Sequence, residues 1–349
     1  MIAKVRNLKR LALSVTVPML VVIAACFLNG CTSVAPINNG PPVAPLALTG
    51  SILDVHDPSS IIKDGKLYYL FSTGQEIPIH CSSDLHDWKD CGSVFATWPA
   101  WVVKDIPAAD SIWAPDISHY NGSYHLYFAV STFGSNHSDI GLLTNATLDA
   151  KSPSYRWVDH GKVIQSTSFD DWNAIDPNLV LDANGQPWLA FGSFWSGLKL
   201  VKIDPATGKP DPGAQIYSIA ERPEPPDAIE ASFIIYREGY YYLFASYDFC
   251  CRGSDSTYNI RIGRSTAITG PYVDEKGVPM TEGGGTPLAE SGSRWRGPGG
   301  ESVFHENDDT WWLIYHSYDA NLAGTPTLRI SPLIWSSTGW PRPVTPIVK

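Results

Sequence analysis

The sequence predicts an all-β fold, a five-bladed β-propeller with four-stranded blades. Five times along the chain an acidic residue opens a short apolar segment, a turn follows, and an aromatic-rich segment returns. The acids of the five copies are Asp57, Asp116, Asp176, Glu230 and Glu301. Repeats of this length built from short strands are typical of propeller blades, whose inner strands converge on one axis. We therefore expect five carboxylates to face one central cavity, and little helix, because no sustained 3.6-residue periodicity is present.

Each copy also contains the remaining strands of a blade. Tight hairpins between the first two strands are predicted at Asp64-Gly65, Asn121-Gly122, Asn184-Gly185 and Glu238-Gly239, with a weaker signal at Asn307-Asp308. Third strands are expected at 79–81, 140–143, 198–203, 259–263 and 327–330. Fourth strands are expected to begin near Trp88, Trp157, Ile216 and Tyr272, and the last blade to end over 340–344. The sequence does not reveal how the ring closes.

Composition and charge exclude some classes of partner. The chain has 349 residues and a formal net charge of -10, and four of its basic residues precede Leu11, so the remainder is more acidic still. Such a surface disfavours nucleic acid and anionic lipid, so no nucleic-acid partner is expected. Thirteen Trp and sixteen Tyr residues are more than a core requires. Sugar-binding clefts use such rings as apolar platforms with a polar edge.

The N-terminus predicts export. A basic start and an uncharged stretch precede Leu28-Asn29-Gly30-Cys31, which resembles the lipobox of bacterial lipoproteins. We expect residues 1–30 to be a lipoprotein signal peptide, 31–47 a flexible tether and 48–349 the propeller. Acylated Cys31 would anchor the protein to the cell envelope, at the outer membrane in a Gram-negative cell. The alternatives are an ordinary secretory peptide, giving a secreted protein, and a single membrane span, which Pro18 disfavours.

Four cysteines lie beyond this signal. Cys81 and Cys91 fall on the expected third and fourth strands of the first blade, where an exported protein permits a disulfide. Cys250 and Cys251 are adjacent and form either a vicinal disulfide or two buried thiols. Neither pair has partners at zinc-ligand spacing. Nothing in the sequence indicates oligomerisation, so a monomer is expected.

The five acids allow a structural and a catalytic interpretation. A carboxylate at a strand start can accept hydrogen bonds from a neighbouring blade, and repeats copy such devices. The copies have diverged, however, because Asp57 and Asp176 precede proline whereas the fourth copy has the longer Glu230. A scaffold gives no reason to mix side-chain lengths. Glycoside hydrolysis does, because a base and an acid must reach opposite sides of one bond.

Six motifs in blade-compatible order indicate a family. They are His56-Asp57-Pro58, Trp113-Ala114-Pro115-Asp116, Asn173-Ala174-Ile175-Asp176-Pro177, Phe191-Gly192-Ser193-Phe194-Trp195, Ile229-Glu230-Ala231-Ser232, and Cys250-Cys251-Arg252-Gly253 with Ser256-Thr257-Tyr258 and Gly263-Arg264-Ser265 after it. Over residues 52–340 the chain resembles glycoside hydrolase family 43, most closely its endo-1,5-α-L-arabinanases. The resemblance implies an inverting hydrolase that cleaves internal α-1,5-L-arabinofuranosyl bonds of arabinan or arabino-oligosaccharides.

The resemblance also implies catalytic roles for three of the acids. Asp57 would be the general base that activates a water, and Glu230 the general acid that protonates the leaving oxygen. Asp176 would orient that acid and help to hold its proton, since a neighbouring charge in a buried cavity raises a carboxyl pKa. Inversion requires the base and the acid to be roughly 6.5–9.5 Å apart.

Further residues receive expected roles. The resemblance implies that His316 lies beside a central calcium or other metal ion, held largely through waters in an oxygen-rich shell. No organic cofactor is expected. Asp116 is assigned mainly to the scaffold, and Glu301 is left unassigned beside Gly299-Gly300, where the backbone is expected to approach the axis closely.

Sugar contacts are expected at the mouth of the cavity. Trp113, Phe133 and Trp195 are candidates for stacking on the substrate, and Asn173 and Ser193 for hydrogen bonds to furanose hydroxyls. Packing between blades explains any one of the aromatic residues equally well.

Two alternatives to endo cleavage stay open. An exo-acting α-L-arabinofuranosidase or a β-xylosidase of the same family would need a loop or an extra domain that closes one end of the cleft into a pocket. A non-catalytic glycan-binding propeller is a possibility of another class, but loss of a catalytic carboxylate would mark it. All three carboxylates are present.

Overall fold

The computed structural model describes residues 44–306 and 310–344. The predicted signal peptide, Cys31, most of the tether and the Asn307-Asp308 turn lie outside these residues, so the expectations about them stay predictions. The described residues belong to one compact unit, Gly40–Lys349. Across both described ranges, no helix combines the length and the apolar character needed to cross a membrane.

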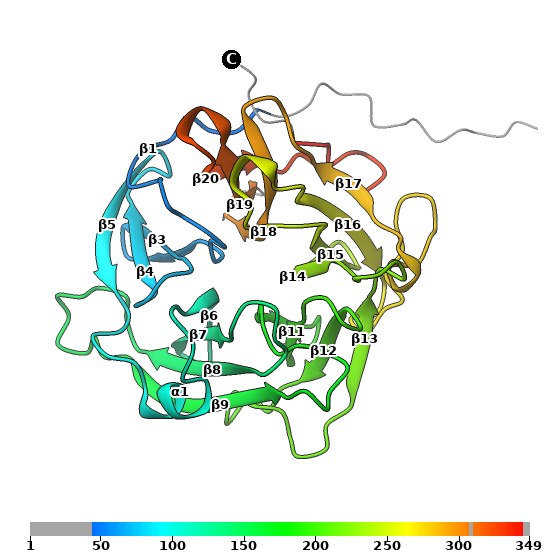
Figure 1. Ribbon diagram of the computed structural model, residues 1–349. Coiled ribbons are helices and arrows are strands. Elements are labelled where there is room, and N and C mark those ends of the chain that lie inside the picture. The colour runs from blue at the N-terminus through cyan, green and yellow to red at the C-terminus, as the bar shows by residue number, and fades with distance from the viewer. Residues whose placement is uncertain (1–43, 307–309, 345–349) are drawn as a thin grey trace, which may run out of the picture. The chain divides into compact units, whose positions relative to one another are not determined.

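Five separate sheets surround one axis, which confirms the predicted propeller (Figure 1). From the axis outward, the first sheet contains β2 (Ile62–Asp64), β3 (Leu67–Phe71), β4 (Pro78–Ser82), β5 (Asp87–Ser93) and β1 (Thr49–Gly50). The second contains β6 (Trp113–Tyr120), β7 (Ser123–Val130), β8 (Ser138–Asn145) and β9 (Val158–Ser166). The third contains β10 (Asn178–Leu181), β11 (Pro187–Phe191), β12 (Leu198–Lys202) and β13 (Ile216–Ala220). The fourth contains β14 (Ile229–Arg237), β15 (Tyr240–Tyr247), β16 (Asn259–Ser265) and β17 (Thr286–Ala289), and the fifth β18 (Trp295–His305), β19 (Trp311–Asp319) and β20 (Thr325–Pro332).

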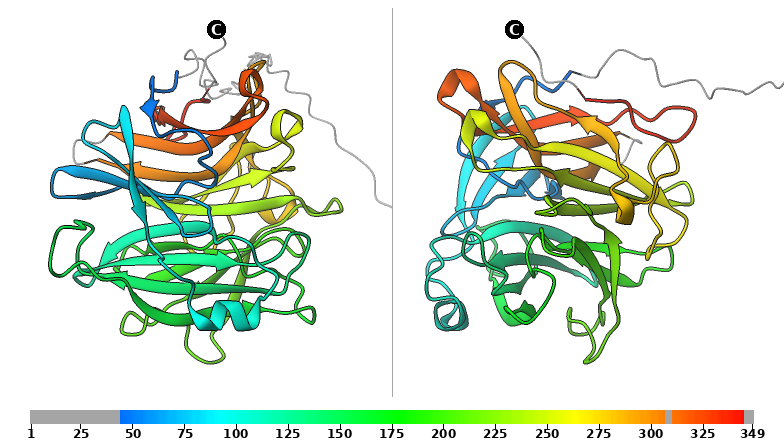
Figure 2. Two further views of the ribbon diagram at one scale, coloured as in Figure 1. Left: turned by 60° about the vertical axis from the view of Figure 1, so that its left-hand side comes forward. Right: turned by 45° about the vertical axis from the view of Figure 1, so that its right-hand side comes forward.

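The apolar runs of the sequence become the central strands of the blades. Because each blade packs between two neighbours, its central strands are buried on both faces and need no polar alternation. In β7 and β15, all residues after the first are buried. The packing between blades is apolar, as where Phe71 of the first blade and Phe128 of the second share one cluster. The side views in Figure 2 show the twist of each sheet and the loops that project beyond the strand ends.

The number of strands differs from four in two blades. The first sheet has five strands and the last has three. The expected last strand of the fifth blade instead joins the fourth, since the Val344 N–H donates to the Leu288 carbonyl at 2.7 Å. The fourth strand of blade four is also later than expected. It is β17, and the segment after Tyr272 forms only isolated bridges through Val273.

The N-terminal segment closes the ring, which the sequence did not reveal. β1 pairs in parallel with β5 of the first blade. The residues around it pair with the last blade, because Leu46 N–H donates to Ile330 O at 2.7 Å and Leu328 N–H donates to Ile52 O at 2.8 Å. One segment therefore supplies the missing outer pairing of the last blade and joins it to the first.

Helix and disulfides complete the fold. Among the described residues, helix is limited to α1 (Ala100–Asp105) and the 3₁₀ turns η1 (Gly253–Asp255), η2 (Met280–Glu282) and η3 (Ala320–Leu322). Cys81 and Cys91 form a disulfide between β4 and β5, which the sequence permits but does not establish. Cys250 and Cys251 also form a disulfide, so the vicinal alternative holds.

Candidate active site

The inner strand of every blade reaches the axis through one repeated backbone feature. At this point each blade has a residue with positive φ: Asp57 (46°), Ala114 (39°), Asp176 (55°), Ala231 (54°) and Gly300 (56°). These residues line a small axial cavity of about 40 Å³. The five acids are therefore not equivalent, because only Asp57 and Asp176 are themselves the residues with positive φ at this point of their blades. β-bulges beside Asp116, Glu230 and Glu301 shift those side chains along their strands.

Two cavities divide the acids, which corrects the expectation of a single one. The axial cavity is bordered by Asp57, Asp116, Asp176 and Glu301. A second cavity of about 550 Å³, which we call the large cavity, is bordered by Asp57, Asp176 and Glu230, with His56, Cys250 and Tyr258 among its other lining residues. Its volume lies within the range of small-molecule sites. The three acids predicted to be catalytic are therefore the three that border the large cavity.

Asp57 is held ionised by its neighbours. Its Oδ2 lies 2.8 Å from His56 Nδ1 and accepts a hydrogen bond from the Thr73 hydroxyl at 2.8 Å. Thr73 is fixed in turn because its Oγ1 accepts the backbone N–H of Ala114 in the next blade. Burial acts to raise the pKa of Asp57, but the charge and hydrogen bond of His56, assisted by Thr73, hold it below its ordinary value. Asp57 is therefore already ionised near neutral pH and is ready to accept a proton from a water molecule.

Glu230 has the opposite character. It is 8% exposed, its Oε2 accepts the Ser193 hydroxyl at 2.6 Å, and its Oε1 accepts the Tyr258 hydroxyl. Burial raises the pKa of Glu230 to about 7; the charge of Asp57 adds to the rise, and the Ser193 hydrogen bond opposes it. Two carboxyls on one cavity with pKa values moved in opposite directions form the pattern of an acid and a base.

Asp176 interacts electrostatically with Glu230. Its Oδ2 accepts the Ala231 N–H at 3.0 Å, which fixes it against the strand that carries Glu230. Burial, and then the negative charges of Glu230 and Asp57, raise its pKa well above the ordinary value. Simultaneous ionisation of Asp176 and Glu230 is therefore disfavoured, and the pair keeps one proton near neutral pH.

The other two acids serve the scaffold and the axial cavity. Asp116 accepts the Leu179 N–H of the next blade at 2.8 Å. In blade three, Asn178 does the same with the Ile234 N–H at 2.9 Å, so this contact needs an oxygen but no charge. The Glu301 Oε2 accepts the Ser246 hydroxyl at 2.5 Å. Burial raises the pKa of Asp116 to about 7 and that of Glu301 to about 8.

A histidine pair lies beside Asp57. The rings of His56 and His316 stack with centroids 3.9 Å apart, and with Asp57 they form a group whose ligand atoms lie within 4.8 Å of one another. Burial, and then the charge of His56, hold the pKa of His316 well below its ordinary value, so its ring is neutral. Its Nδ1 accepts the Asp57 N–H at 3.2 Å, which places the ring proton on Nε2. That buried Nε2 has no hydrogen-bond partner within residues 44–306 and 310–344, so it suits donation to a water better than direct binding of a cation.

The Gly300 backbone approaches this group closely, as expected from the sequence. A Cβ at Gly300 would lie 2.5 Å from Asp57 Oδ1 and 2.9 Å from His316 Nδ1. The positive φ of Gly300 adds a second reason for glycine here.

Comparison with known proteins decides the family. Residues 51–341 match the model of Glycosyl hydrolases family 43. The chain belongs to glycoside hydrolase family 43. It is 47% identical over 292 residues to an extracellular endo-α-(1→5)-L-arabinanase of Bacillus subtilis, covering 82% of this chain and 87% of that protein. It is 43% identical over 314 residues to an extracellular exo-α-(1→5)-L-arabinofuranosidase of Cellvibrio japonicus, covering 86% and 89%.

A solved family 43 structure has a similar fold and contains a sugar. The α-L-arabinanase of Cellvibrio cellulosa in complex with arabinohexaose is 42% identical to the chain and superposes with a TM-score of 0.80. The alignment covers 84% of this chain and 96% of that one.

The sugar-contact residues expected from the family 43 resemblance fall into two groups. Trp113 and Phe133 border the large cavity, and Phe133 is 82% exposed. Trp195 is 39% exposed but is not among the lining residues. Asn173 and Ser193 are buried and already bonded, Asn173 Oδ1 to the Ser138 hydroxyl at 2.6 Å and Ser193 to Glu230. The sugar-binding roles of all five stay predictions, and the geometry gives Ser193 a second role in orienting Glu230.

Sequence reasoning missed that three hydroxyls orient the acids, although it named Ser193 as a sugar contact. Thr73, Ser193 and Ser246 each follow or end the second strand of a blade, and each donates to an acid at the axis. The repeated Ser or Thr two residues after a phenylalanine of the aromatic-rich segment was a signal for this device. Tyr258, which bonds to Glu230, belongs to a quoted motif but had no role assigned to it, and Tyr318, which bonds to His56, gave no comparable signal.

Proposed function

We propose that this family 43 chain hydrolyses internal α-1,5-L-arabinofuranosyl bonds of arabinan with inversion at the anomeric carbon. The observation that carries the proposal is the pairing of two carboxyls on the large cavity: the pKa of Asp57 is lowered and that of Glu230 is raised to about 7. Asp176 joins them and couples electrostatically to Glu230. A binding module would have no need to keep a buried, partly protonated acid beside an ionised one.

The chemistry follows from these protonation states. Asp57 accepts a proton from a water as the water oxygen bonds to the anomeric carbon. The bond to the glycosidic oxygen breaks on the opposite side, and that oxygen takes the proton of Glu230. Asp176 and Glu230 disfavour simultaneous ionisation, which keeps a proton available on this pair of carboxyls. Afterwards Asp57 holds the proton and Glu230 is ionised, and exchange with solvent restores both.

The relatives support arabinan as the substrate and endo cleavage as the mode. The Bacillus subtilis protein is named an endo-arabinanase and the Cellvibrio japonicus protein an exo-arabinofuranosidase, and identity is higher to the former. The arabinohexaose complex supports an oligosaccharide ligand for this fold. Exo cleavage is the second candidate, and the products separate the two. The chain is proposed to act as a monomer.

A metal ion is proposed beside His316. The fit rests on His316 Nε2, which has no partner in the described part of the chain, and on the carboxylate of Asp57 within the same group. Calcium prefers oxygen ligands, so waters between the ion and the imidazole fit the site better than two nitrogen ligands would. When bound, such an ion would add positive charge near Asp57. His316 itself fixes the Asp57 backbone through its Nδ1.

The pH dependence of kcat/KM is expected to show an alkaline limb with an apparent pKa near 7. Glu230 must be protonated to act, and its pKa is raised to about 7 by burial, so activity falls as pH rises through that value. Ser193→Ala removes the hydrogen bond that lowers this pKa and should move the limb to higher pH. Initial rates on linear arabinan between about pH 5 and 9 test both expectations. A rate that increases steadily across this range would contradict the role of Glu230.

We further propose that the enzyme is an exported lipoprotein with signal peptide 1–30, tether 31–47 and catalytic propeller 48–349. The two curated relatives are named as extracellular, which supports export. Cys31→Ala is expected to release the protein from membranes, because two or more acyl chains are needed for stable anchoring. Fractionation of cells that express either form tests this. Equal sedimentation of the variant and the parent with membranes would refute the lipid anchor.

A further inference from the structure

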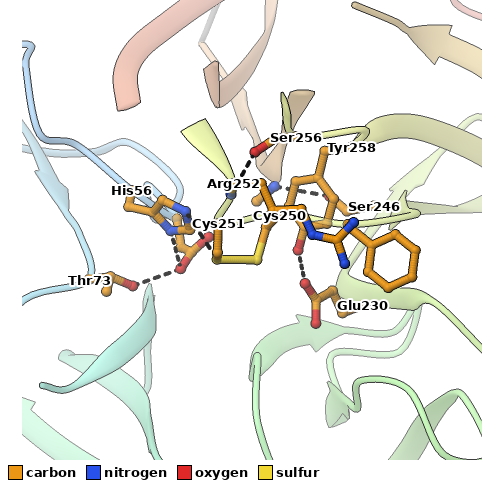
Figure 3. The surroundings of a disulfide bond; sticks show 12 residues. His56, Thr73, Glu230, Ser246, Cys250, Cys251, Arg252, Ser256 and Tyr258 are labelled. Carbon is orange, nitrogen blue, oxygen red and sulfur yellow. Dashed lines mark hydrogen bonds and ion pairs between the residues drawn. A yellow bond between two sulfur atoms is a disulfide. The ribbon is translucent and has the colours of Figure 1, made fainter. Parts of the chain in front are cut away.

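We propose that the vicinal disulfide Cys250–Cys251 is a positioning element of the active site. It fixes the loop 248–258 so that one end orients the base Asp57 and the other orients the acid Glu230. In Figure 3 the disulfide lies between His56 and Glu230, and both cysteines border the large cavity. The inference rests on the proposed function and adds a device that sets the geometry between its two catalytic groups.

The base side of the device is a chain of hydrogen bonds. The backbone N–H of Cys251 donates to the Tyr318 hydroxyl oxygen at 2.8 Å, and that oxygen lies 2.7 Å from His56 Nε2. His56 Nδ1 lies 2.8 Å from Asp57 Oδ2. The Tyr318 oxygen therefore binds Cys251 on one side and Nε2 of His56 on the other, which fixes the orientation of the imidazole ring. The Nδ1–H then donates to Asp57, so the chain fixes both the ring and the carboxylate.

The acid side of the same loop ends at Tyr258. Its hydroxyl donates to Glu230 Oε1, as Figure 3 shows. The two ends of the loop are clamped together, because the Phe249 carbonyl accepts the N–H groups of Thr257 at 2.9 Å and Tyr258 at 3.1 Å. The Thr257 hydroxyl also accepts the Phe249 N–H at 3.2 Å. Because the loop is closed at its base, Cys251 can move relative to Tyr258 only if the few residues between them change conformation.

The disulfide holds the part of the loop that packing does not hold. Cys251 is exposed and has φ of 66°, a conformation that few residues other than glycine adopt. A bond between consecutive side chains restricts this dipeptide. It keeps the Cys251 N–H on Tyr318 and the Cys251 sulfur 3.8 Å from His56 Nε2. Without the bond, Cys251 is free to leave the left-handed region, and its N–H then leaves Tyr318.

The expected effect of losing the disulfide is a loss of turnover. Misplacement of a catalytic group by about 1 Å can lower the rate roughly 10²-fold. We therefore expect Cys250→Ser/Cys251→Ser to lower kcat on linear arabinan roughly 10- to 10²-fold with a smaller change in KM. Tyr318→Phe removes the next link and should give a loss of similar size. Combining the two changes should add little, because both act through one contact chain.

The experiment measures kcat and KM of the full-length chain on linear arabinan, with unfolding temperature as a check on folding. The matched control is Cys81→Ser/Cys91→Ser, which removes the disulfide between β4 and β5, away from both cavities. On that background, treatment with a water-soluble phosphine tests the vicinal bond without any mutation at it. The phosphine takes up the oxygen of one water to become the phosphine oxide, and the disulfide gains two electrons and two protons to give two thiols. Reduction should lower kcat to the level of the serine variant, and reoxidation should restore it.

Three results would overturn the inference. The first is full kcat in a folded Cys250→Ser/Cys251→Ser variant, and the second is full kcat after verified reduction. The third is strict additivity of the disulfide and Tyr318→Phe effects, which would assign them to separate causes. These results leave the parent enzyme active and the proposed function intact. A parent chain with no activity on arabinan would instead overturn the proposed function, and this inference with it.

Discussion

Glu230→Gln is expected to fold normally and to lose roughly 10²–10⁴-fold in kcat on linear arabinan. The glutamine can accept the Ser193 hydroxyl through its oxygen and bond Tyr258 through its amide, so the buried contacts of Glu230 are kept. It cannot give a proton to the leaving oxygen. Steady-state rates on linear arabinan, with unfolding temperature measured beside them, test the expectation.

The leaving group supplies an internal control for this variant. Hydrolysis of a nitrophenyl arabinobioside releases nitrophenolate, a stable leaving group that needs little protonation, so Glu230→Gln should lose far less activity on this substrate than on arabinan. Equal losses on the two substrates would contradict the role of Glu230 as the acid. Full activity on arabinan would contradict it more simply.

Asp57→Asn is expected to lose a similar factor, roughly 10²–10⁴-fold, on both substrates. Water must be activated whatever the leaving group, and an amide cannot take the proton. On the nitrophenyl substrate Asp57→Asn should therefore lose much more activity than Glu230→Gln, and this difference distinguishes the base from the acid. Rates on both substrates measure the difference. Substantial recovery of Asp57→Asn on the nitrophenyl substrate would contradict its role as the base.

Asp116→Asn is the matched control for Asp57→Asn. Both acids border the axial cavity, but Asp116 does not border the large one. Asn178 already makes the equivalent contact with the next blade, so an amide should serve at position 116. Burial raises the folded-state pKa of Asp116 to about 7, so its ionisation disfavours the fold as pH rises toward that value. The variant should therefore keep its activity and lose no stability at neutral pH.

The fold could be predicted because the blade repeats itself in sequence. Each acid-opened segment, turn and aromatic-rich segment is local, and burial between blades explains the apolar runs. Ring closure could not be predicted, because the pairing of Leu46 and Ile52 with β20 joins opposite ends of the chain. The displaced fourth strand of blade four has a similar origin. β17 follows a long connection, and only tertiary contacts determine where pairing resumes.

The sequence singled out three acids that the structure brings to one cavity, but it did not predict how the five acids are arranged. Asp57, Asp176 and Glu230 carried motif signals, and all three border the large cavity. Asp116 and Glu301 border the axial cavity but not the large one. This placement depends on β-bulges, which shift each of these acids one or two residues away from the axial positive-φ residue of its blade. The contacts of Tyr318 and Cys251 with each other and with His56 bring together three different blades, so no local pattern predicts them.

The central claim is inverting endo cleavage of arabinan, and one time course tests it most directly. The purified full-length chain is incubated with linear α-1,5-arabinan, while products are followed by size and the first-formed anomer is followed by proton NMR. We expect an early ladder of mixed oligosaccharides whose new reducing ends appear first in the β configuration, opposite to the α linkage. Arabinose as the only early product would contradict endo action. New ends that appear first as the α anomer would contradict the roles assigned to Asp57 and Glu230.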